Sequence, residues 1–267
     1  MIDQASLQRD LTALGVRAGD FLMVHASLRK LGLARSQVGD GGPEMLLDAL
    51  EAAVGPSGTL VMILGSDYAY DWVNQRPVEE RAKLLAGTPP FDVQTASVLP
   101  EVGWFAEVFR LRAGTLLSSN PSGRFAARGR DAQALLSDQP WNDYYGPGSP
   151  LEKLCARGGK VLRLGADPNT VTVLHYAEYV ARVASKRRTR WDYLIAGEGG
   201  ARHVWIDCLD DAEGIADWDD DYFTLITNAY VAAGKARRGR VGLAASELID
   251  AADFVAFGAA WMEEHFR

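Results

Sequence analysis

The sequence predicts an α/β fold in which a mostly parallel central sheet is flanked by helices. Short, continuously apolar segments such as residues 21–25 and 58–65 alternate with segments whose apolar residues recur at helical spacing. A strand that is apolar on both faces has to be covered on both sides, which is typical of parallel sheets between two layers of helices. With 267 residues, 48% of them hydrophobic, we expect residues 1–267 to form a single domain.

The predicted elements follow from local patterns along the chain. Leu7, Leu11 and Leu14 share one helix face, and Gly15 is expected to end that helix. Pro43 is a suitable first helical residue for a second helix, which stops at Gly55. The remaining predicted elements are strands at 21–25, 58–65 and 159–165 and helices at 222–234 and 251–266.

Residues 66–103 lack this regularity. Prolines stand at positions 77, 89, 90 and 100, and the apolar residues follow no single period. We therefore expect a long ordered loop, an irregular insertion on the substrate side of a binding site.

Composition excludes several classes of protein. No run approaches the roughly 18 to 20 apolar residues of a membrane span, and the start "MIDQASLQRDL" lacks the pattern of a signal peptide, so we expect a cytoplasmic protein without a membrane partner. Cys155 and Cys208 form no CxxC pair, and none of the four histidines belongs to an H-E-x-x-H motif. We expect no metal cofactor.

One segment holds the excess negative charge. Residues 207–221 contain eight of the 35 acidic residues and no Lys or Arg, so the rest of the chain, with 28 basic and 27 acidic residues, is nearly neutral. Phosphates would be repelled by this segment, which disfavours nucleic acid as a partner. A cation is its natural ligand; the alternative is a solvated loop that aids solubility.

The stretch "NTVTVLHYAE", residues 169–178, carries the clearest catalytic signal. It follows the predicted strand at 159–165, where ligands of α/β sheets tend to bind, and we expect a helix beginning near Thr170 or Thr172 with a Thr or Asn cap. His175 and Glu178 are three residues apart and share a helix face, so the carboxylate can orient an imidazole that takes up a proton. A packed structural histidine is the alternative. No G-x-S-x-G motif supports a serine hydrolase.

The glycine-rich stretch "GDGGPEML" precedes the helix that begins near Pro43. Its backbone N–H groups could hold a phosphate at the helix N-terminus. It matches neither a Walker loop nor G-x-G-x-x-G, and a simple turn into the helix is the alternative.

Several blocks together resemble the aminoglycoside 3-N-acetyltransferase family, antibiotic N-acetyltransferases with a fold distinct from that of the GNAT enzymes. They occur in the family's order from about residue 11 to the C-terminus: "LMVHASLRKLG", "VGPSGTLVM", "PPFD", "GSPLEKL", "KVLRLGADPNTVTVLHYAE" and "NAYVAAGKARRGRVGLAASELIDAADFVAFGAAWMEEHF". The resemblance implies an enzyme that binds acetyl-CoA and an aminoglycoside together. It would transfer the acetyl group directly to the 3-amino group of 2-deoxystreptamine, conferring antibiotic resistance.

The resemblance also implies roles for individual residues. His175 matches the family's histidine and would act as the general base. Either Glu107 or Glu178 would orient it, and either Thr170 or Thr172 would hydrogen-bond the thioester oxygen.

Two further sets of residues match the binding sites of the family. The cofactor set comprises Ser27, Leu28, Arg29, Lys30, Gly41, Gly42, Ser118 and Ser119. The substrate set comprises Asp67, Tyr70, Glu79, Glu80, Asp210, Asp211 and Glu213, whose carboxylates suit a polycationic sugar.

The chain departs from the family at one motif and leaves two other functions open. Where the family commonly shows R-S-x-H-P, Leu117 replaces the arginine and Asn120 the histidine. The first alternative is an N-acetyltransferase of the same fold that acts on a different amine. The second is a non-catalytic protein that binds polyamine drugs through its acidic face.

Overall fold

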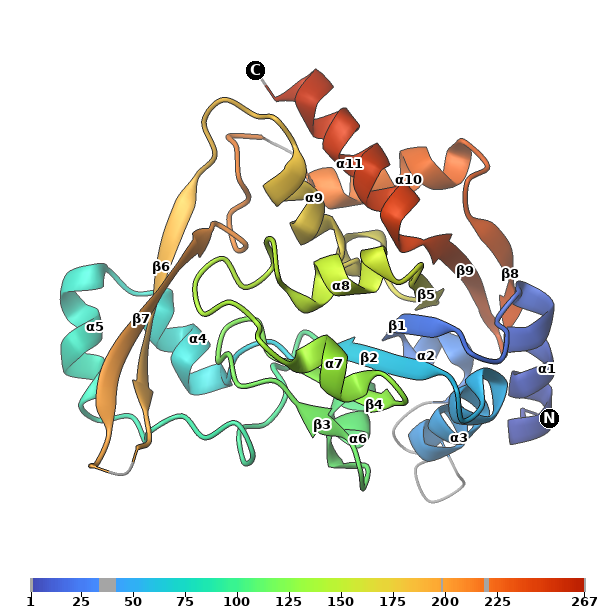
Figure 1. Ribbon diagram of the computed structural model, residues 1–267, viewed down its shortest axis with the longest axis horizontal. Helices are drawn as coiled ribbons and strands as arrows, with labels where there is room; N and C mark the ends of the chain where they lie inside the picture. The colour runs from blue at the N-terminus through green and yellow to red at the C-terminus, as the bar shows by residue number, and fades with distance from the viewer. Residues whose placement is uncertain (1, 34–41, 198, 219–220, 267) are drawn as a thin grey trace.

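The computed structural model describes residues 2–33, 42–197, 199–218 and 221–266. Within them, the main sheet has seven strands in the order β3-β4-β2-β1-β5-β9-β8 (Figure 1). β1 pairs in parallel with β2 and with β5, whereas β4 and β9 run antiparallel to both of their neighbours. Five of the seven strands thus point the same way, and the predicted α/β fold is confirmed. The strands are β1 Phe21–Ala26, β2 Thr59–Ile63, β3 Leu116–Leu117, β4 Phe125–Gly129, β5 Lys160–Leu164, β8 Arg237–Val241 and β9 Ala244–Asp250.

Helices cover both faces of this sheet because its central strands are apolar on both sides. In β1, Leu22 and Val24 pack into one buried cluster, whereas Met23 packs into the other. Helices that bury side chains in the first cluster are α1 Gln4–Leu14, α2 Leu28–Leu31, α3 Gly42–Val54 and α6 Trp104–Leu111. Helices that do so in the second include α7 Ala132–Leu136, α8 Pro150–Ala156, α9 Leu174–Val180, α10 Tyr222–Ala232 and α11 Ala251–His265.

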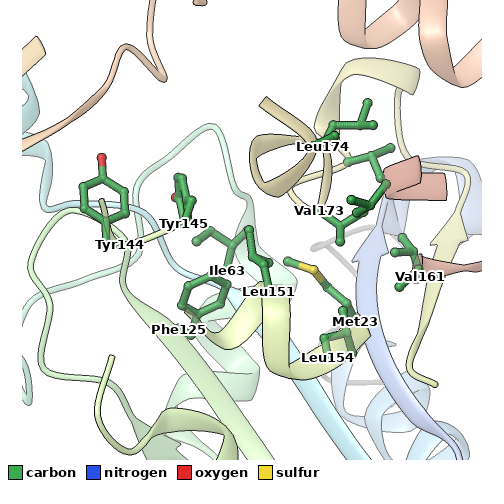
Figure 2. Close-up of a cluster of buried hydrophobic side chains, with 14 of the residues drawn as sticks. Met23, Ile63, Phe125, Tyr144, Tyr145, Leu151, Leu154, Val161, Val173 and Leu174 are labelled. Atoms are coloured by element: carbon green, nitrogen blue, oxygen red, sulfur yellow. The ribbon is translucent and has the colours of Figure 1, made fainter. Parts of the chain in front are cut away.

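The second cluster supports the region where the functional site lies. Figure 2 shows Met23 of β1, Val161 of β5 and Leu154 of α8 in one apolar layer, which continues through Phe125 to Tyr145. Met23 and Val161 are fully buried, and each such side chain contributes roughly 1.5–3 kcal/mol through removal of apolar surface from water. The edge of Phe125 meets Tyr145 with 5.9 Å between ring centroids, which fixes Tyr145 on a rigid base.

The N-terminal helix begins and ends as its sequence predicts. Asp3 caps α1 by accepting a hydrogen bond from the backbone N–H of Ser6, and the Ser6 hydroxyl bonds the Asp3 backbone in return. Gly15 ends the helix with φ of +116°, a conformation that side chains with a Cβ rarely adopt.

The prediction of an irregular loop at residues 66–103 is wrong in part, because the segment contains two helices, α4 Tyr68–Asn74 and α5 Val78–Leu85. The prolines led to the prediction of a loop, and their positions in the structure explain why two helices form instead. Pro77 directly precedes α5, and the other three lie outside both helices, so the prolines delimit short helices without interrupting them.

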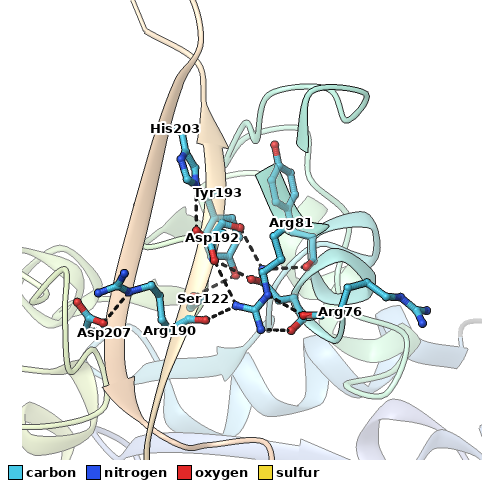
Figure 3. Close-up of polar contacts among 10 residues, drawn as sticks. Arg76, Arg81, Ser122, Arg190, Asp192, Tyr193, His203 and Asp207 are labelled. Atoms are coloured by element: carbon cyan, nitrogen blue, oxygen red, sulfur yellow. Dashed lines mark hydrogen bonds and ion pairs between the residues drawn. The ribbon is translucent and has the colours of Figure 1, made fainter. Parts of the chain in front are cut away.

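A two-stranded hairpin, β6 Arg188–Ile195 and β7 Arg202–Leu209, packs against α4 and α5. Figure 3 shows the buried polar contacts that join them. The Arg81 guanidinium of α5 donates to the backbone oxygens of Asn74 and Arg190 and to the Asp192 carboxylate, and the Asp192 carboxylate also contacts His203 at 2.9 Å. The insertion and the hairpin are therefore held as one wall.

No helix within the described ranges is both long enough and apolar enough to span a membrane.

Candidate active site

A cavity of about 900 Å³ opens at the carboxyl ends of the central parallel strands. Ser27 follows β1, Gly65 follows β2 and Ala166 follows β5, and all three line it. Ligands of α/β sheets bind at this edge because loops from neighbouring strands converge there. Residues of α6, α9, β6 and α10 complete the wall, among them Phe105, His175, Trp191 and Phe223.

His175 and Glu178 form a hydrogen-bonded pair on α9. His175 Nδ1 lies 2.8 Å from Glu178 Oε2, and the Tyr222 hydroxyl donates to the other carboxylate oxygen, Oε1. Because the carboxylate can only accept, the neutral imidazole carries its hydrogen on Nδ1 and keeps a lone pair on Nε2. Among the described residues none hydrogen-bonds that Nε2. In this arrangement Nε2 is available to accept a hydrogen bond or a proton.

Aromatic rings hold the His175 imidazole in place. Tyr145 stacks on it with 4.9 Å between centroids and 12° between planes, and Phe223 approaches at 4.8 Å. Burial disfavours the imidazolium, but the charges of Glu178 and Asp211 outweigh burial, so the pKa of His175 is raised above its ordinary value. A raised pKa improves the histidine as a proton acceptor.

Asp211 places a half-buried carboxylate on the cavity wall. The Tyr144 hydroxyl and Trp191 Nε1 both donate to it, the latter at 3.2 Å. Burial raises the pKa of Asp211, although a protonated His175 and the Tyr144 hydrogen bond act in the opposite direction. A carboxylate that burial disfavours in this way gains from a cationic ligand in the cavity.

A helix begins near Thr172 as expected, but the expectation that a Thr or Asn side chain caps it is wrong. Pro168–Thr170 form a 3-10 turn, and α9 begins at Leu174 after Val173, which makes no capping hydrogen bond. The β-branched residues at 170–173 favour extended backbone, so the regular helix starts later.

The two threonines differ in their hydroxyl partners. The Thr170 hydroxyl donates to the backbone oxygen of Asp167 at 2.8 Å. Thr172 is buried at the cavity wall, and its hydroxyl bonds none of the described residues. Thr172 is therefore the threonine with a free donor.

Glu178, and not Glu107, hydrogen-bonds His175 in the structure, which corrects the expectation for Glu107. The Glu107 carboxylate pairs with Arg110 at 2.5 Å and accepts from the backbone N–H of Val98. Hydrogen bonds from Arg110, more than its burial, hold the pKa of Glu107 below the ordinary value. Glu107 does not line the cavity.

The residues expected on the cofactor side divide into two groups. Ser27, Leu28 and Arg29 line the cavity where β1 leads into α2. Lys30 does not; its ammonium pairs with Asp167 at 2.5 Å across the same rim. Gly41 lies outside the described residues.

The other expected cofactor residues do not reach the cavity. Gly42 is buried at the start of α3, and Ser119 is exposed. The buried Ser118 hydroxyl accepts from the backbone N–H of Phe125. Asn120, which replaces the common family histidine, is also structural. Its side chain bonds four backbone groups, those of Pro140, Trp141, Ser122 and Gly123.

The expected substrate residues of the insertion point elsewhere. Asp67 caps α4, and the buried Tyr70 hydroxyl donates to the backbone oxygens of Pro89 and Leu194. Glu79 and Glu80 are exposed on α5 and do not line the cavity. The insertion instead contributes Asp71, Asn74 and Glu101 to the wall. The Asp71 pKa is raised by burial and by the charge of Glu101.

Of the described acids in the segment 207–221, one contributes a carboxylate to the cavity. Asp210 is buried and accepts hydrogen bonds from the backbone N–H groups of Ala212 and Glu213, so it holds a turn. Glu213 is exposed, and Asp217 and Asp207 pair with arginines of the β6 region. Asp211 alone among these described acids lines the cavity.

The aromatic residues of the site were not predicted from the sequence. Tyr144, Tyr145, Trp191, Tyr222 and Phe223 all contact His175, Glu178 or Asp211. In a sequence, such residues match the pattern of an apolar core. The adjacent pair "YY" within the turn-rich stretch "WNDYYGPGSP" was an available signal, because two bulky rings in a loop need a reason to be there.

The chain is similar to known proteins over most of its length. The family model described as aminoglycoside 3-N-acetyltransferase matches residues 23–263. Aminoglycoside N(3)-acetyltransferase III of Pseudomonas aeruginosa is 39% identical over 255 residues, which cover 95% of this chain and 91% of that protein. The structure of AAC-IIIb in a binary complex with CoASH superposes with a TM-score of 0.89 at 37% identity, covering 99% of this chain and 97% of the other. AAC-VIa bound to sisomicin gives 0.87 at 36% identity, with coverages of 99% and 98%.

Proposed function

The chain belongs to the aminoglycoside 3-N-acetyltransferase family, and from this premise we propose that His175 is the general base for direct acetyl transfer from acetyl-CoA to the 3-amino group of 2-deoxystreptamine. Membership identifies the protein as an aminoglycoside 3-N-acetyltransferase, an enzyme class of antibiotic resistance. The observation that carries the proposed mechanism is the His175–Glu178 pair, whose free Nε2 lies on the wall of the cavity.

The proposed reaction needs one proton transfer and one acyl transfer. The amine nitrogen attacks the thioester carbon, the carbon–sulfur bond breaks, and the CoA sulfur leaves with the electron pair. His175 Nε2 takes the proton that the amine loses, and Glu178 stabilises the imidazolium through Nδ1. The Tyr222 hydroxyl, bonded to the second Glu178 oxygen, fixes the carboxylate in this orientation.

Thr172 is the proposed donor to the thioester oxygen as it gains negative charge. Its hydroxyl has no partner among the described residues and is not fully enclosed, and the residue stands three positions before His175. A donor already fixed at the cavity wall stabilises a developing oxyanion without reorganisation. Thr170 suits this role less, because its hydroxyl already donates to Asp167.

The cavity offers different chemistry to the two substrates. Ser27, Leu28 and Arg29 form the proposed acetyl-CoA side, supported by the likeness to AAC-IIIb in complex with CoASH. Asp211, Asp71 and Glu101 form the proposed aminoglycoside side, since carboxylates attract ammonium groups. The likeness to AAC-VIa bound to sisomicin supports an aminoglycoside as that cation.

The test of this function is release of CoA thiol in the presence of a panel of amines. Release with aminoglycosides supports the proposal. Release only with other amines indicates a different substrate, and binding of aminoglycosides without release indicates a non-catalytic binder.

We predict that the product carries its acetyl group on the 3-amino nitrogen. Only an amine held within about 3 to 3.5 Å of the thioester carbon reacts efficiently, so a single nitrogen should be modified. NMR of the product identifies it. Acetylation of a 6′- or 2′-amine would contradict the assignment.

Glu178→Gln is expected to move the acid limb of the kcat/KM profile to lower pH. The base must be neutral, so the rate rises as pH rises through the His175 pKa, which the negative charge of Glu178 helps to hold above 6.5. Without that charge, burial dominates and the pKa falls. The matched control is Glu107→Gln, because Glu107 pairs with Arg110. A shift in E107Q with none in E178Q would reverse the assignment of the two carboxylates.

A further inference from the structure

The imidazole of a second histidine on the cavity wall has no hydrogen-bond partner among the described residues. His25, near the end of β1, is 7% exposed and lines the cavity. Its Nε2 is fully enclosed, and no described residue hydrogen-bonds either ring nitrogen. Leaving a buried polar group unpaired costs about 1–3 kcal/mol, and an apolar residue would fit the strand "FLMVHA" without this cost. Such an exception needs a ligand or another explanation.

The neighbouring strand determines which ring nitrogen of His25 carries the hydrogen. His25 stands opposite Arg163 of β5, whose Nε is likewise enclosed without a partner among the described residues. Burial and the nearby guanidinium lower the pKa of His25 to about 3, so the ring is neutral at physiological pH. A guanidinium only donates, which favours the tautomer with a lone pair on the enclosed Nε2 and the hydrogen on Nδ1. Nδ1 has no hydrogen-bond partner among the described residues either. Unlike Nε2 it is not fully enclosed by the protein, so it is accessible from the cavity.

The position of His25 indicates which substrate it meets. It precedes the turn that carries Ser27 and Leu28 on the proposed acetyl-CoA side, and it neighbours β5, the strand that leads to Thr172. An acyl arm of acetyl-CoA that extends from the turn at Ser27 and Leu28 toward His175 would therefore pass His25. The Arg163 guanidinium disfavours an ammonium group beside His25. A neutral N–H donor suits the neutral carbonyl oxygens that line the arm of acetyl-CoA.

We propose that His25 binds acetyl-CoA by donating its Nδ1–H to a carbonyl oxygen of the pantetheine arm. This inference rests on the proposed function, because it requires acetyl-CoA in the cavity. It assigns the two cavity histidines opposite roles. His175 presents a lone pair that accepts a proton, whereas His25 presents a hydrogen to the cosubstrate.

The tautomer and the contact are measured directly by NMR of the full-length protein with ¹⁵N-labelled histidine. We expect His25 to show the Nδ1–H tautomer, and we expect its Nδ1 resonance to shift on titration with CoA but not with sisomicin. A hydrogen on Nε2, or an Nδ1 resonance unmoved by saturating CoA, would overturn the proposal.

Two substitutions separate the hydrogen bond from the shape of the side chain. His25→Leu keeps an apolar bulk and removes both nitrogens, and it should weaken CoA binding in calorimetry about tenfold, as expected for one lost hydrogen bond that leaves a carbonyl unpaired. His25→Asn places an amide N–H near the position of Nδ1 and should restore most of this affinity. The KM for the aminoglycoside should stay close to wild type, and the melting temperature of H25L should not fall below that of wild type, because leucine leaves no unpaired nitrogen in the strand.

The binding measurement needs no acceptor amine, so it separates two kinds of failure. If wild type and H25L bind CoA equally, the role of His25 is refuted and the proposed function stands. If wild type itself does not bind CoA, both proposals fall. If H25N binds CoA as weakly as H25L while His25→Gln binds it like wild type, then Nε2 is the atom that donates to CoA and the proposed tautomer is wrong.

Discussion

His175→Ala is expected to lower kcat by at least about 10²-fold while leaving the KM for acetyl-CoA nearly unchanged, because a general base contributes about 10²- to 10⁴-fold to the rate. The expectation follows from the geometry of α9. Nδ1 is held by Glu178 at 2.8 Å, and Nε2 is free on the cavity wall. Steady-state kinetics at saturating aminoglycoside, above the acid limb of the profile, measure the effect.

The alanine variant carries a structural cost that needs its own control. It leaves a gap between the rings of Tyr145 and Phe223, and it removes a partner of Glu178, which is 1% exposed. His175→Asn addresses both points, because its amide N–H can still donate to the carboxylate while no group replaces Nε2. We expect H175N to fold like wild type and to be as slow as H175A. Activity near wild type in H175N would show that the alanine effect was structural and that another group is the base.

The parts of the fold that the sequence predicted are those specified by local patterns. The apolar strands β1, β2 and β5 and the helices α1, α10 and α11 appear where runs or helical periodicity place them. The helices of the insertion were missed because Tyr68–Asn74 and Val78–Leu85 are short and lie between prolines. Each is stabilised by packing on the β6–β7 hairpin rather than by its own periodicity.

The candidate site was predictable only where the spacing of two residues along one helix determines the direction in which their side chains point. His175 and Glu178 share a face of α9 because they are three residues apart, and that pair was found. Asp67 and Tyr70 were expected to contact the substrate, yet one caps a helix and the other is buried in the core. The residue types suited the ligand, but tertiary packing decides which way such side chains point.

In the acidic segment, too, the composition gives the charge but not the direction in which each carboxylate points. Its composition suggested a field that attracts a polycation as a whole. In the structure, Asp207 and Asp217 are paired with Arg190 and Arg187, and Asp210 bonds backbone N–H groups. Exposed pairs of this kind contribute little attraction and are screened over about 8 to 10 Å. Of the described acids in this segment, Asp211 is therefore the one we expect to select a cation, together with Asp71 and Glu101 on the cavity wall.

Asp211→Asn is accordingly expected to raise the aminoglycoside KM at least about 30-fold, since removing one partner of a buried charge pair costs about 2 to 5 kcal/mol. Tyr144 and Trp191 donate to different oxygens of Asp211. In the asparagine variant the amide oxygen accepts from Trp191 Nε1 and the amide N–H donates to the Tyr144 hydroxyl oxygen, so the wall should keep its shape while it loses its charge. Because Asp211 also helps to raise the His175 pKa, its removal should lower that pKa, and the kinetics are best compared above both acid limbs. The KM for acetyl-CoA should not change.

The matched control removes the same charge one residue away. Asp210→Asn keeps the oxygen that accepts from the backbone N–H groups of Ala212 and Glu213, and it changes no atom of the cavity wall. We expect D210N to retain the wild-type KM for both substrates, and Asp217→Asn, at a fully exposed side chain, to do the same. If D210N and D217N raised the aminoglycoside KM as much as D211N, the long-range charge of segment 207–221 would select the substrate. An effect confined to D211N requires direct contact, because a charge that differs in position by one residue has almost the same long-range field.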